Sequence, residues 1–464
     1  MITAIATTTL GENKSAPRIW FDGMKLVRSG FDISDHFNIV PNLLERTLKI
    51  VKKAEGLRTV SRKKRSYGDM PVIDINNKSL ADIFGKNKLL KVVFAIGAIT
   101  VSLHPTVVAQ EVRLARLQNK LTTGAPLSIG SLPHGAGIMD LAIKDGLAKA
   151  GLKSSMAFAL DMQSSFLDVS MKNNPVWSAD TVAIETRVED LDLNDIPVVD
   201  VLVAGVPCPG ASLSGKAKNK NKFAELHPTA GTFFHHFINV CRKAQSSVVV
   251  LENVVPYANT AGYHVLRTSL ERMGYSIHES QVRGEDHGAF ETRKRFVMIA
   301  VTDGLFYSGH IESTPVRPAT LGTILDPDVP EEAYRNLSYL DRKAEKDAAA
   351  GKGFKLQRVT ADSTKVGTLG AGYHKWRSTE AHVAHPTKPG FARLLTPKEH
   401  ARVKTIPAVV VKDVAPTLAH ELLGQSVIFN AFVAVGKAIG LALTTDASEQ
   451  AGQGLPLFDQ SITA

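Results

Sequence analysis

The rhythm of apolar and polar positions changes near residue 123. Before that point, short runs alternate between apolar and polar residues and are separated by polar turns, as in RTLKIVKK, MPVIDIN and LKVVFAIGAITVSL. Alternation with a period of two is typical of β-strands that bury one face. The pattern therefore predicts a β-rich N-terminal module over residues 1–122.

Between residues 123 and 301, apolar strand-like runs are each followed by a helical segment. APLSIGSL precedes MDLAIKDGLAKAG, MAFALDM precedes QSSFLDVSMKN, SSVVVLENV precedes HVLRTSLERMG, and KRFVMIAV closes the region. Strands that alternate with helices favour a mainly parallel sheet covered by helices on both faces. We predict an α/β domain here.

The remaining chain divides into three parts. Residues 302–390 lose the alternation and are rich in Gly, Pro, Lys and Asp, which predicts a small inserted domain. In residues 391–444 the helical segments TPKEHARV and SVIFNAFVAVGKAIGLAL return, and we expect them to pack back onto the sheet. The polar residues 445–464 are expected to form a disordered tail.

Composition narrows the class of protein. The formal net charge of +10 and the pI near 9.4 favour a polyanionic partner. The absence of a signal peptide and of a long apolar run predicts a soluble protein with no membrane partner. Two cysteines, Cys208 and Cys241, are too few for a disulfide framework or a cysteine-based zinc site. The adjacent His235 and His236 point in different directions on a helix, so we expect no metal.

Chemically capable side chains stand at the ends of three predicted strands. VVDVLVAGV runs into Pro207-Cys208-Pro209, SSVVVLENV ends in Glu252-Asn253, and KRFVMIAV follows Arg293 directly and has Arg295 as its second residue. Strand ends at one edge of a parallel sheet are where α/β proteins gather ligands. A lone cysteine is more often a packing residue, as we expect for Cys241, but a thiol beside a carboxyl and two guanidiniums favours a catalytic site.

These motifs, in this order, resemble the DNA cytosine-5 methyltransferase family, whose pattern is Pro-Cys, then Glu-Asn-Val, then Gln-x-Arg-x-Arg. The resemblance covers about Leu127–Leu443 outside the insertion, although Glu291 stands where the family has Gln. It implies a Rossmann-like methyltransferase sheet over residues 123–301, completed by closing motifs in 391–444 and interrupted by a target-recognition segment at 302–390. It also implies the activity, which is methyl transfer from S-adenosylmethionine to C5 of a flipped cytosine in duplex DNA, in the cytoplasm and nucleoid of a bacterium.

The resemblance assigns four catalytic residues. Cytosine C5 becomes nucleophilic only after a thiolate adds to C6, and Cys208 supplies that thiol. Glu252 is expected to hydrogen-bond N3 and the exocyclic amine, best with a pKa raised by burial. Arg293 and Arg295 offer donors, one to the base O2 or a phosphate and the other to brace the loop.

The resemblance also assigns a cofactor site and a mobile loop. Gly135 and Gly137 lie in a glycine-rich loop that lets the backbone approach S-adenosylmethionine, and Asp161 is expected to hold the ribose hydroxyls. Met162 is expected against the adenine, with Phe233 and Ser426 completing the cofactor site. The active-site loop is predicted to include Ser212, Gly215 and Lys216, whose basic neighbours would lie near DNA phosphates.

Two features, one near each end of the chain, have both a functional and a non-functional interpretation. The N-terminal module, with PRIWFDGMKLVRSGFDISDHF, resembles bacterial swapped-hairpin β folds, which suggests a DNA-binding or dimerising role, whereas its basic run Arg62–Arg65 is also consistent with a solvated turn. In the tail, Gln453–Phe458 resembles peptides that bind the bacterial sliding clamp, and a plain disordered end is the alternative.

Two rival functions remain. One is a tRNA cytosine-5 methyltransferase of similar architecture, and the other is a catalytically inactive DNA-binding regulator. Retention of Cys208, Glu252, Arg293 and Arg295 argues against the inactive regulator.

Overall fold

The structure is a computed structural model of the 464-residue chain. It describes residues 1–85, 88–207, 225, 227, 231–314, 316–351 and 356–444 in full, and residues 445–453 as backbone. The described chain divides into two compact units, Met1–Val112 and Arg113–Ala464.

The N-terminal unit is built almost entirely from antiparallel strands. Its two sheets have the strand orders β1-β9-β10-β5-β4-β6 and β2-β3-β8-β7. Apolar side chains from both sheets, among them Ile19, Phe37 and Phe94, form one core. The elements are β1 (Ile2–Thr9), β2 (Gly11–Asn13), β3 (Ala16–Asp22), α1 (Met24–Arg28), β4 (His36–Asn42), β5 (Thr47–Lys52), β6 (Arg58–Thr59), β7 (Ser61–Arg65), β8 (Gly68–Asn76), α2 (Ser79–Phe84), β9 (Leu89–Ala95) and β10 (Ala98–Leu103).

Helix α3 (Pro105–Thr123) begins in the first unit and ends in the second. The sequence placed the domain boundary near residue 122, whereas the second unit begins at Arg113. The second unit begins earlier because hydrogen bonds attach this part of α3 to it. The buried Arg113 donates to Thr302 Oγ1 at 2.8 Å and to the Met273 carbonyl at 2.9 Å. Arg116 and Lys120, on the same helix, pair with the fully buried Asp200.

The second unit is built on a seven-stranded sheet of order β13-β12-β11-β14-β15-β17-β16. Its neighbours are parallel from β13 through β15, and β17 is antiparallel to the strands on both sides. The strands are β11 (Leu127–Ser131), β12 (Ser154–Asp161), β13 (Val182–Glu185), β14 (Val201–Gly205), β15 (Val248–Asn253), β16 (Tyr275–Arg283) and β17 (Lys294–Thr302). The predicted Rossmann-like α/β sheet is confirmed.

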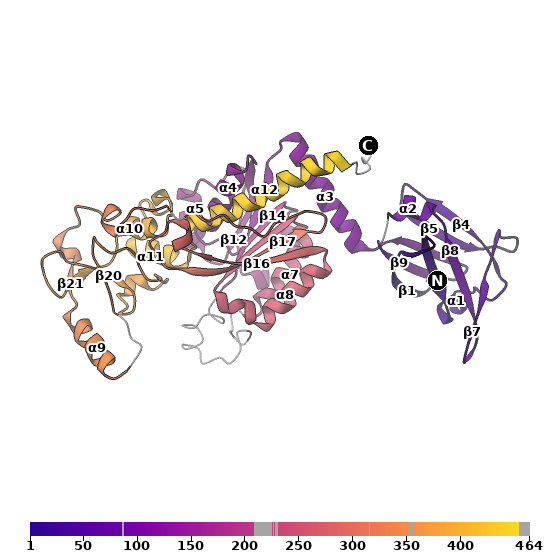
Figure 1. Ribbon diagram of the computed structural model, residues 1–464, viewed down its shortest axis with the longest axis horizontal. Coiled ribbons are helices and arrows are strands. Elements are labelled where there is room, and N and C mark those ends of the chain that lie inside the picture. Colours follow the sequence, from indigo (N-terminus) through magenta and orange to yellow (C-terminus); the bar gives the residue numbers. More distant parts are fainter. Residues whose placement is uncertain are drawn as a thin grey trace. The chain divides into compact units, whose positions relative to one another are not determined.

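Helices cover both faces of this sheet, as Figure 1 shows. Alternate residues of the central strands enter opposite cores: Val203 and Val250 lie in the core with α4 (Ile138–Lys149) and α12 (Phe429–Gln453). Leu202 and Val249 lie in the other core, with α7 (Phe233–Ala244) and α8 (Ala261–Arg272). Burial on both faces explains why these strands are continuous apolar runs in the sequence.

Glycines allow α4 and α12 to approach closely. A Cβ on Gly146 would lie 2.3 Å from the Val433 carbonyl oxygen, and one on Gly436 would lie 2.6 Å from that of Ile143. Helix α12 then continues to Gln453, into the segment expected to be disordered. Its last residues, TTDASEQAGQ, include Ala, Glu and Gln, which favour helix.

A small four-stranded sheet of order β18-β21-β20-β19 forms within and just after the inserted segment. Its own core includes Tyr373, Val383 and Leu395. The remaining elements are β18 (Arg335–Asn336), α9 (Ser338–Ala349), β19 (Gln357–Val359), β20 (Ala381–Ala384), β21 (Phe391–Arg393), α5 (Ser164–Asn173), α10 (Pro397–Val403) and α11 (Pro416–Gln425).

Within the described ranges, no single helix is long and apolar enough to span a membrane. One bent pair, α11 with residues Phe429–Thr444 of α12, meets the criteria of length and composition. Many of its apolar side chains are buried in the core of the second unit.

Candidate active site

The strand ends predicted to carry chemistry share one edge of the seven-stranded sheet. Strands β14 and β15 are parallel and in register, with Gly205 opposite Glu252. Strand β17 runs the other way, so its first residues, Lys294 and Arg295, begin at the edge where β15 ends in Asn253. The topology therefore brings a carboxyl and a guanidinium together from separate parts of the chain.

Glu252 and Arg295 form a close pair at this edge. Arg295 Nε lies 2.8 Å from Glu252 Oε1, and the two side chains are 14% and 11% exposed. Burial raises the pKa of Glu252, and the neighbouring Arg295 opposes that shift. This carboxyl therefore binds a proton more readily than an exposed glutamate does.

The chain enters the segment of the predicted nucleophile directly beside this carboxyl. Val206 follows Gly205, and its amide donates to the Glu252 carbonyl at 3.1 Å. A Cβ on Gly205 would lie 3.9 Å from Glu252 Oε2. Cys208 itself lies outside the described residues, as do Ser212, Gly215 and Lys216 of the predicted loop.

Arg293 is buried and connects separate segments of the second unit. Its Nη2 donates to the Gly424 carbonyl at 3.1 Å, and its Nη1 lies 3.3 Å from both the Leu369 carbonyl and Glu291 Oε1. These contacts join the start of β17 to the end of the inserted segment and to α11. Of the two arginines, Arg295 is the one that contacts the predicted catalytic carboxyl.

Sequence reasoning missed a lysine next to Arg293. Lys404, directly after α10, is fully buried, and its Nζ lies 3.1 Å from Glu291 Oε2. Burial lowers the pKa of Lys404 to about 7, and Glu291 opposes this shift. No local pattern in ARVKTIP distinguishes this lysine from an exposed one, although the unusual Glu291 is a signal that a cation is needed nearby.

The predicted cofactor loop connects β11 to α4. Gly135 and Gly137 have φ of 59° and 66°, in the left-handed region that favours glycine. The Gly135 amide donates to Asp161 Oδ2 at 2.7 Å, and the other oxygen, Oδ1, accepts from the Gln163 amide at 2.9 Å. Asp161, at the end of β12, thus holds the loop by its backbone.

A buried polar network that the sequence did not reveal supports this loop. His134 Nε2 lies 2.8 Å from Ser170 Oγ, and its Nδ1 lies 3.0 Å from Asp140 Oδ2. A Cβ on Gly137 would lie 2.5 Å from the His134 ring, so only glycine fits there. The Asn174 side chain donates to the Ala136 carbonyl at 2.8 Å.

The other predicted cofactor residues lie in different surroundings. Met162, next to Asp161, is 52% exposed. Phe233, at the start of α7, is buried and stacks on Phe237 with a centroid separation of 5.9 Å. Ser426, after α11, donates its hydroxyl to the Leu423 carbonyl at 2.6 Å.

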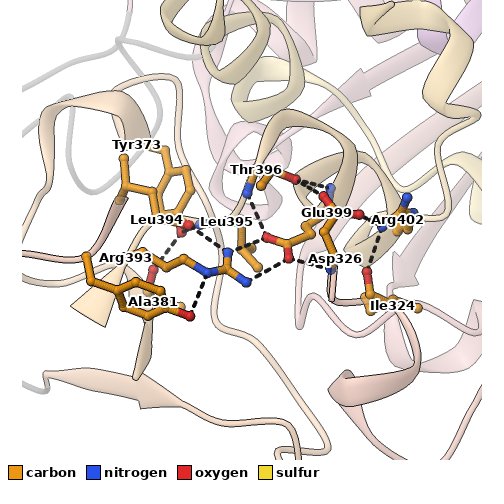
Figure 2. A network of polar contacts seen from close by, with 11 residues as sticks. Ile324, Asp326, Tyr373, Ala381, Arg393, Leu394, Leu395, Thr396, Glu399 and Arg402 are labelled. Carbon is orange, nitrogen blue, oxygen red and sulfur yellow. Dashed lines mark hydrogen bonds and ion pairs between the residues drawn. The ribbon is translucent and has the colours of Figure 1, made fainter. Parts of the chain in front are cut away.

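A second network, drawn in Figure 2, fastens the inserted segment to α10. Arg393 forms a bidentate pair with the buried Glu399, with distances of 2.6 and 2.8 Å. Thr396 and Glu399 form a capping box at the start of α10. Asp326 accepts from Thr396 Oγ1 and Arg402 Nη1, both at 2.6 Å, and so ties the first part of the insertion to the same helix.

Neither metal nor clamp binding gains structural support. Among the residues that the structure describes, no group of three or more His, Cys, Asp or Glu side chains could hold a metal ion. The predicted clamp peptide begins at Gln453, the last residue of α12, and the rest of it lies outside the described residues. That interaction stays a prediction from the sequence.

Known proteins resemble this chain over most of its second unit. Residues 127–441 match the family model described as C-5 cytosine-specific DNA methylase. The chain is 29% identical over 266 residues to Type II methyltransferase M.MspI of Moraxella sp., which covers 56% of this chain and 60% of that protein. It is 27% identical over 250 residues to Type II methyltransferase M1.ScrFI of Lactococcus lactis subsp. cremoris, covering 52% and 62%. The matches thus span less than two thirds of these relatives.

Solved structures resemble the chain in fold. The S. pombe Dnmt2 methyltransferase has a TM-score of 0.53 and 17% identity, over 69% of this chain and 99% of that one. The Entamoeba histolytica methyltransferase EhMeth has a TM-score of 0.54 and 14% identity, over 68% and 98%. Both support the Rossmann-like α/β architecture.

Proposed function

The chain belongs to the C-5 cytosine-specific DNA methylase family, and we propose that it methylates C5 of cytosine in duplex DNA with S-adenosylmethionine as the donor. The observation that carries this proposal is the buried Glu252–Arg295 pair, placed where the chain runs into Cys208. Activation of a cytosine ring requires a thiol as nucleophile, a protonated carboxyl as general acid and a cation that holds this carboxyl in position.

In the proposed reaction, the Cys208 thiolate adds to C6 and forms an S–C6 bond. The electron pair displaced from the C5–C6 double bond is stabilised as a proton passes from Glu252 to N3, which leaves an enamine with a nucleophilic C5. The raised pKa of Glu252 favours the protonated carboxyl needed for this step. We propose that the second carboxyl oxygen, Oε2, accepts from the exocyclic amine, while Arg295 holds the carboxyl in place through Oε1.

The remaining steps restore aromaticity. S-adenosylmethionine, when bound, supplies the methyl group that C5 takes up. A base then removes the C5 proton, the S–C6 bond breaks with return of the thiolate, and the N3 proton goes back to Glu252. Because C6 is inaccessible within a stacked duplex, the target base must leave the helix, at a cost of a few kcal/mol.

The loop residues fit the proposed cofactor. Gly135 and Gly137 keep Cβ atoms away from the loop backbone, and a side chain at Gly137 would collide with His134. Asp161 is fixed against the loop with further acceptor sites on its oxygens, and the exposed Met162 follows it. We propose that Asp161 accepts from the ribose hydroxyls, with Met162, Phe233 and Ser426 completing the site.

We also propose that the small sheet of the inserted segment belongs to the target-recognition region. The Arg393–Glu399 and Asp326–Arg402 pairs fasten it to α10, and Arg293 fastens its end to β17. Such a rigid support would hold the recognition residues at a fixed position and orientation with respect to the catalytic carboxyl.

Covalent trapping tests the mechanism. In duplex DNA containing 5-fluorocytosine, the fluorine at C5 cannot leave as a proton, so the Cys208 adduct should persist as a denaturation-resistant protein–DNA complex in the presence of S-adenosylmethionine. Cys208→Ser should abolish the complex. An equal yield of adduct from Cys208→Ser would contradict the assignment, and labelled methyl transfer to tRNA with none to duplex DNA would assign the tRNA reaction instead.

A further inference from the structure

The hairpin formed by β7 and β8 stands out because most of its residues are exposed. Ser61 to Arg65 pair with Val72 to Gly68 in register, and the two-residue connection is Ser66-Tyr67. Of the ten residues from 61 to 70, eight are exposed and two are half-buried. Burial begins only at Val60 on one strand and Pro71 on the other. A two-stranded ribbon of this kind gains little stability from packing.

This ribbon is basic on both sides. Strand alternation places Arg62 and Lys64 on one face and Lys63 and Arg65 on the other. Asp69 is the one acidic residue between 61 and 70. The tip carries Tyr67, which is 73% exposed.

The N-terminal unit as a whole is also basic. Residues 1–112 contain seventeen lysines and arginines against ten aspartates and glutamates, whereas the rest of the chain contains thirty-eight against thirty-five. Most of the net charge of +10 therefore belongs to this unit, which is the smaller of the two.

Acidic neighbours hold the basic side chains only weakly. Arg62 pairs with Asp69 at 3.2 Å, and Lys63 and Arg65 pair with Asp22 at 3.0 and 2.6 Å. The side chains of these pairs are between 27% and 61% exposed. Exposed ion pairs contribute little to stability, so phosphate groups can compete for the same cations.

We propose that the β7–β8 ribbon is a DNA-binding element that enters a groove of duplex DNA and contacts its phosphates. A major groove about 12 Å wide admits a two-stranded ribbon. Basic residues on both faces match a groove that has a phosphate backbone on each side. A single exposed aromatic at the tip does not provide the series of stacking platforms typical of single-strand binders. The proposal extends the proposed function, because it adds a contact that the catalytic unit does not supply.

The test measures binding of the full chain to a labelled duplex by fluorescence anisotropy over a range of salt concentrations, without cofactor. The ribbon variant is Arg62→Gln with Lys64→Gln and Arg65→Gln. The matched control, Lys49→Gln with Lys53→Gln and Arg58→Gln, removes the same charge from exposed residues near the other sheet of the same unit.

At low salt the ribbon variant should bind at least about tenfold more weakly, and its slope of log K against log salt concentration should be reduced by roughly 2–3. The control variant should keep most of the affinity and most of the slope. Equal losses in the two variants would show long-range charge rather than a contact, and unchanged binding would also overturn the proposal. A ribbon variant that loses affinity for tRNA but not for duplex DNA would overturn it as well. Because binding is measured without catalysis, failure of the proposed methyl transfer would not affect this result.

Discussion

Lys404 Nζ lies 3.1 Å from Glu291 Oε2, and both side chains are fully buried. Glu291 occupies the position at which the family pattern has an uncharged Gln. A buried carboxylate without a cation is strongly unfavourable. The buried lysine therefore compensates the charge of Glu291, and the effects of replacing these two residues are expected to depend on each other.

We predict that Lys404→Met lowers the thermal unfolding midpoint, because it removes one of the two cations that contact Glu291 within the described part of the chain; removal of one partner of a buried pair costs about 3–5 kcal/mol. Glu291→Gln should cost less above neutral pH, because Lys404, with a pKa already near 7, can become neutral. The double variant Glu291→Gln with Lys404→Met should lose much less than the two single losses added together. Strictly additive losses would contradict the coupling.

A second prediction concerns the pH dependence of methyl transfer. If Glu252 donates a proton to N3, its protonated form is active, so the rate should fall as pH rises through its raised pKa. Arg295 lowers that pKa, so Arg295→Gln should move the fall to higher pH, besides reducing the maximal rate. Glu252→Gln should reduce the rate by about 10²–10⁴-fold and remove this dependence. Single-turnover rates over a pH series measure both effects, and an unmoved alkaline limb in Arg295→Gln would count against proton donation by Glu252.

A third prediction concerns acid stability. His382 is fully buried, and neither ring nitrogen has a hydrogen-bond partner among the residues that the structure describes; burial lowers its pKa from 6.5 to about 4. The folded state thus prefers the neutral ring, so its contribution to stability is complete above pH 6.5 and is lost as pH falls towards 4, by about 3 kcal/mol at most. His382→Leu should flatten that part of the stability profile. The exposed His235→Gln is the control, and equal profiles for the two variants would refute the assignment.

The cofactor loop gives a fourth prediction. Gly137 and Gly124 share a φ of 66°, but a Cβ at Gly124 meets nothing within 4 Å, whereas one at Gly137 collides with His134. Both alanine variants therefore suffer the same backbone strain, and only Gly137→Ala displaces the loop. Calorimetric titration with S-adenosylmethionine should show at least about tenfold weaker binding for Gly137→Ala and near-normal binding for Gly124→Ala. Equal affinities would place the loop outside the cofactor site.

The sequence predicted the parts of the site that stand at strand ends. The apolar runs located β14, β15 and β17 and so put Glu252 and Arg295 at strand ends, whereas their pairing follows from the antiparallel direction of β17, which only the structure shows. The resemblance to a known family supplied the roles. Locating the strands and assigning the roles both used local patterns in the sequence and no information on contacts between distant side chains.

The contacts that the sequence did not predict are tertiary and polar. Lys404 and His134 sit in local patterns that fit exposed residues equally well, and only packing shows that one faces Glu291 and the other Asp140. The boundary after the N-terminal unit differs for a similar reason, because Arg113 on α3 is a buried anchor of the second unit. Hydrophobic periodicity does not record such partners.

The most direct test of the central claim is base-resolution sequencing of methylated cytosine in DNA from a methylation-free bacterial host that expresses the chain. We predict C5 methylation at a defined sequence motif, and its complete loss with Cys208→Ala. Soluble, folded protein that leaves the host DNA unmethylated, or methylation that persists in Cys208→Ala, would contradict the account.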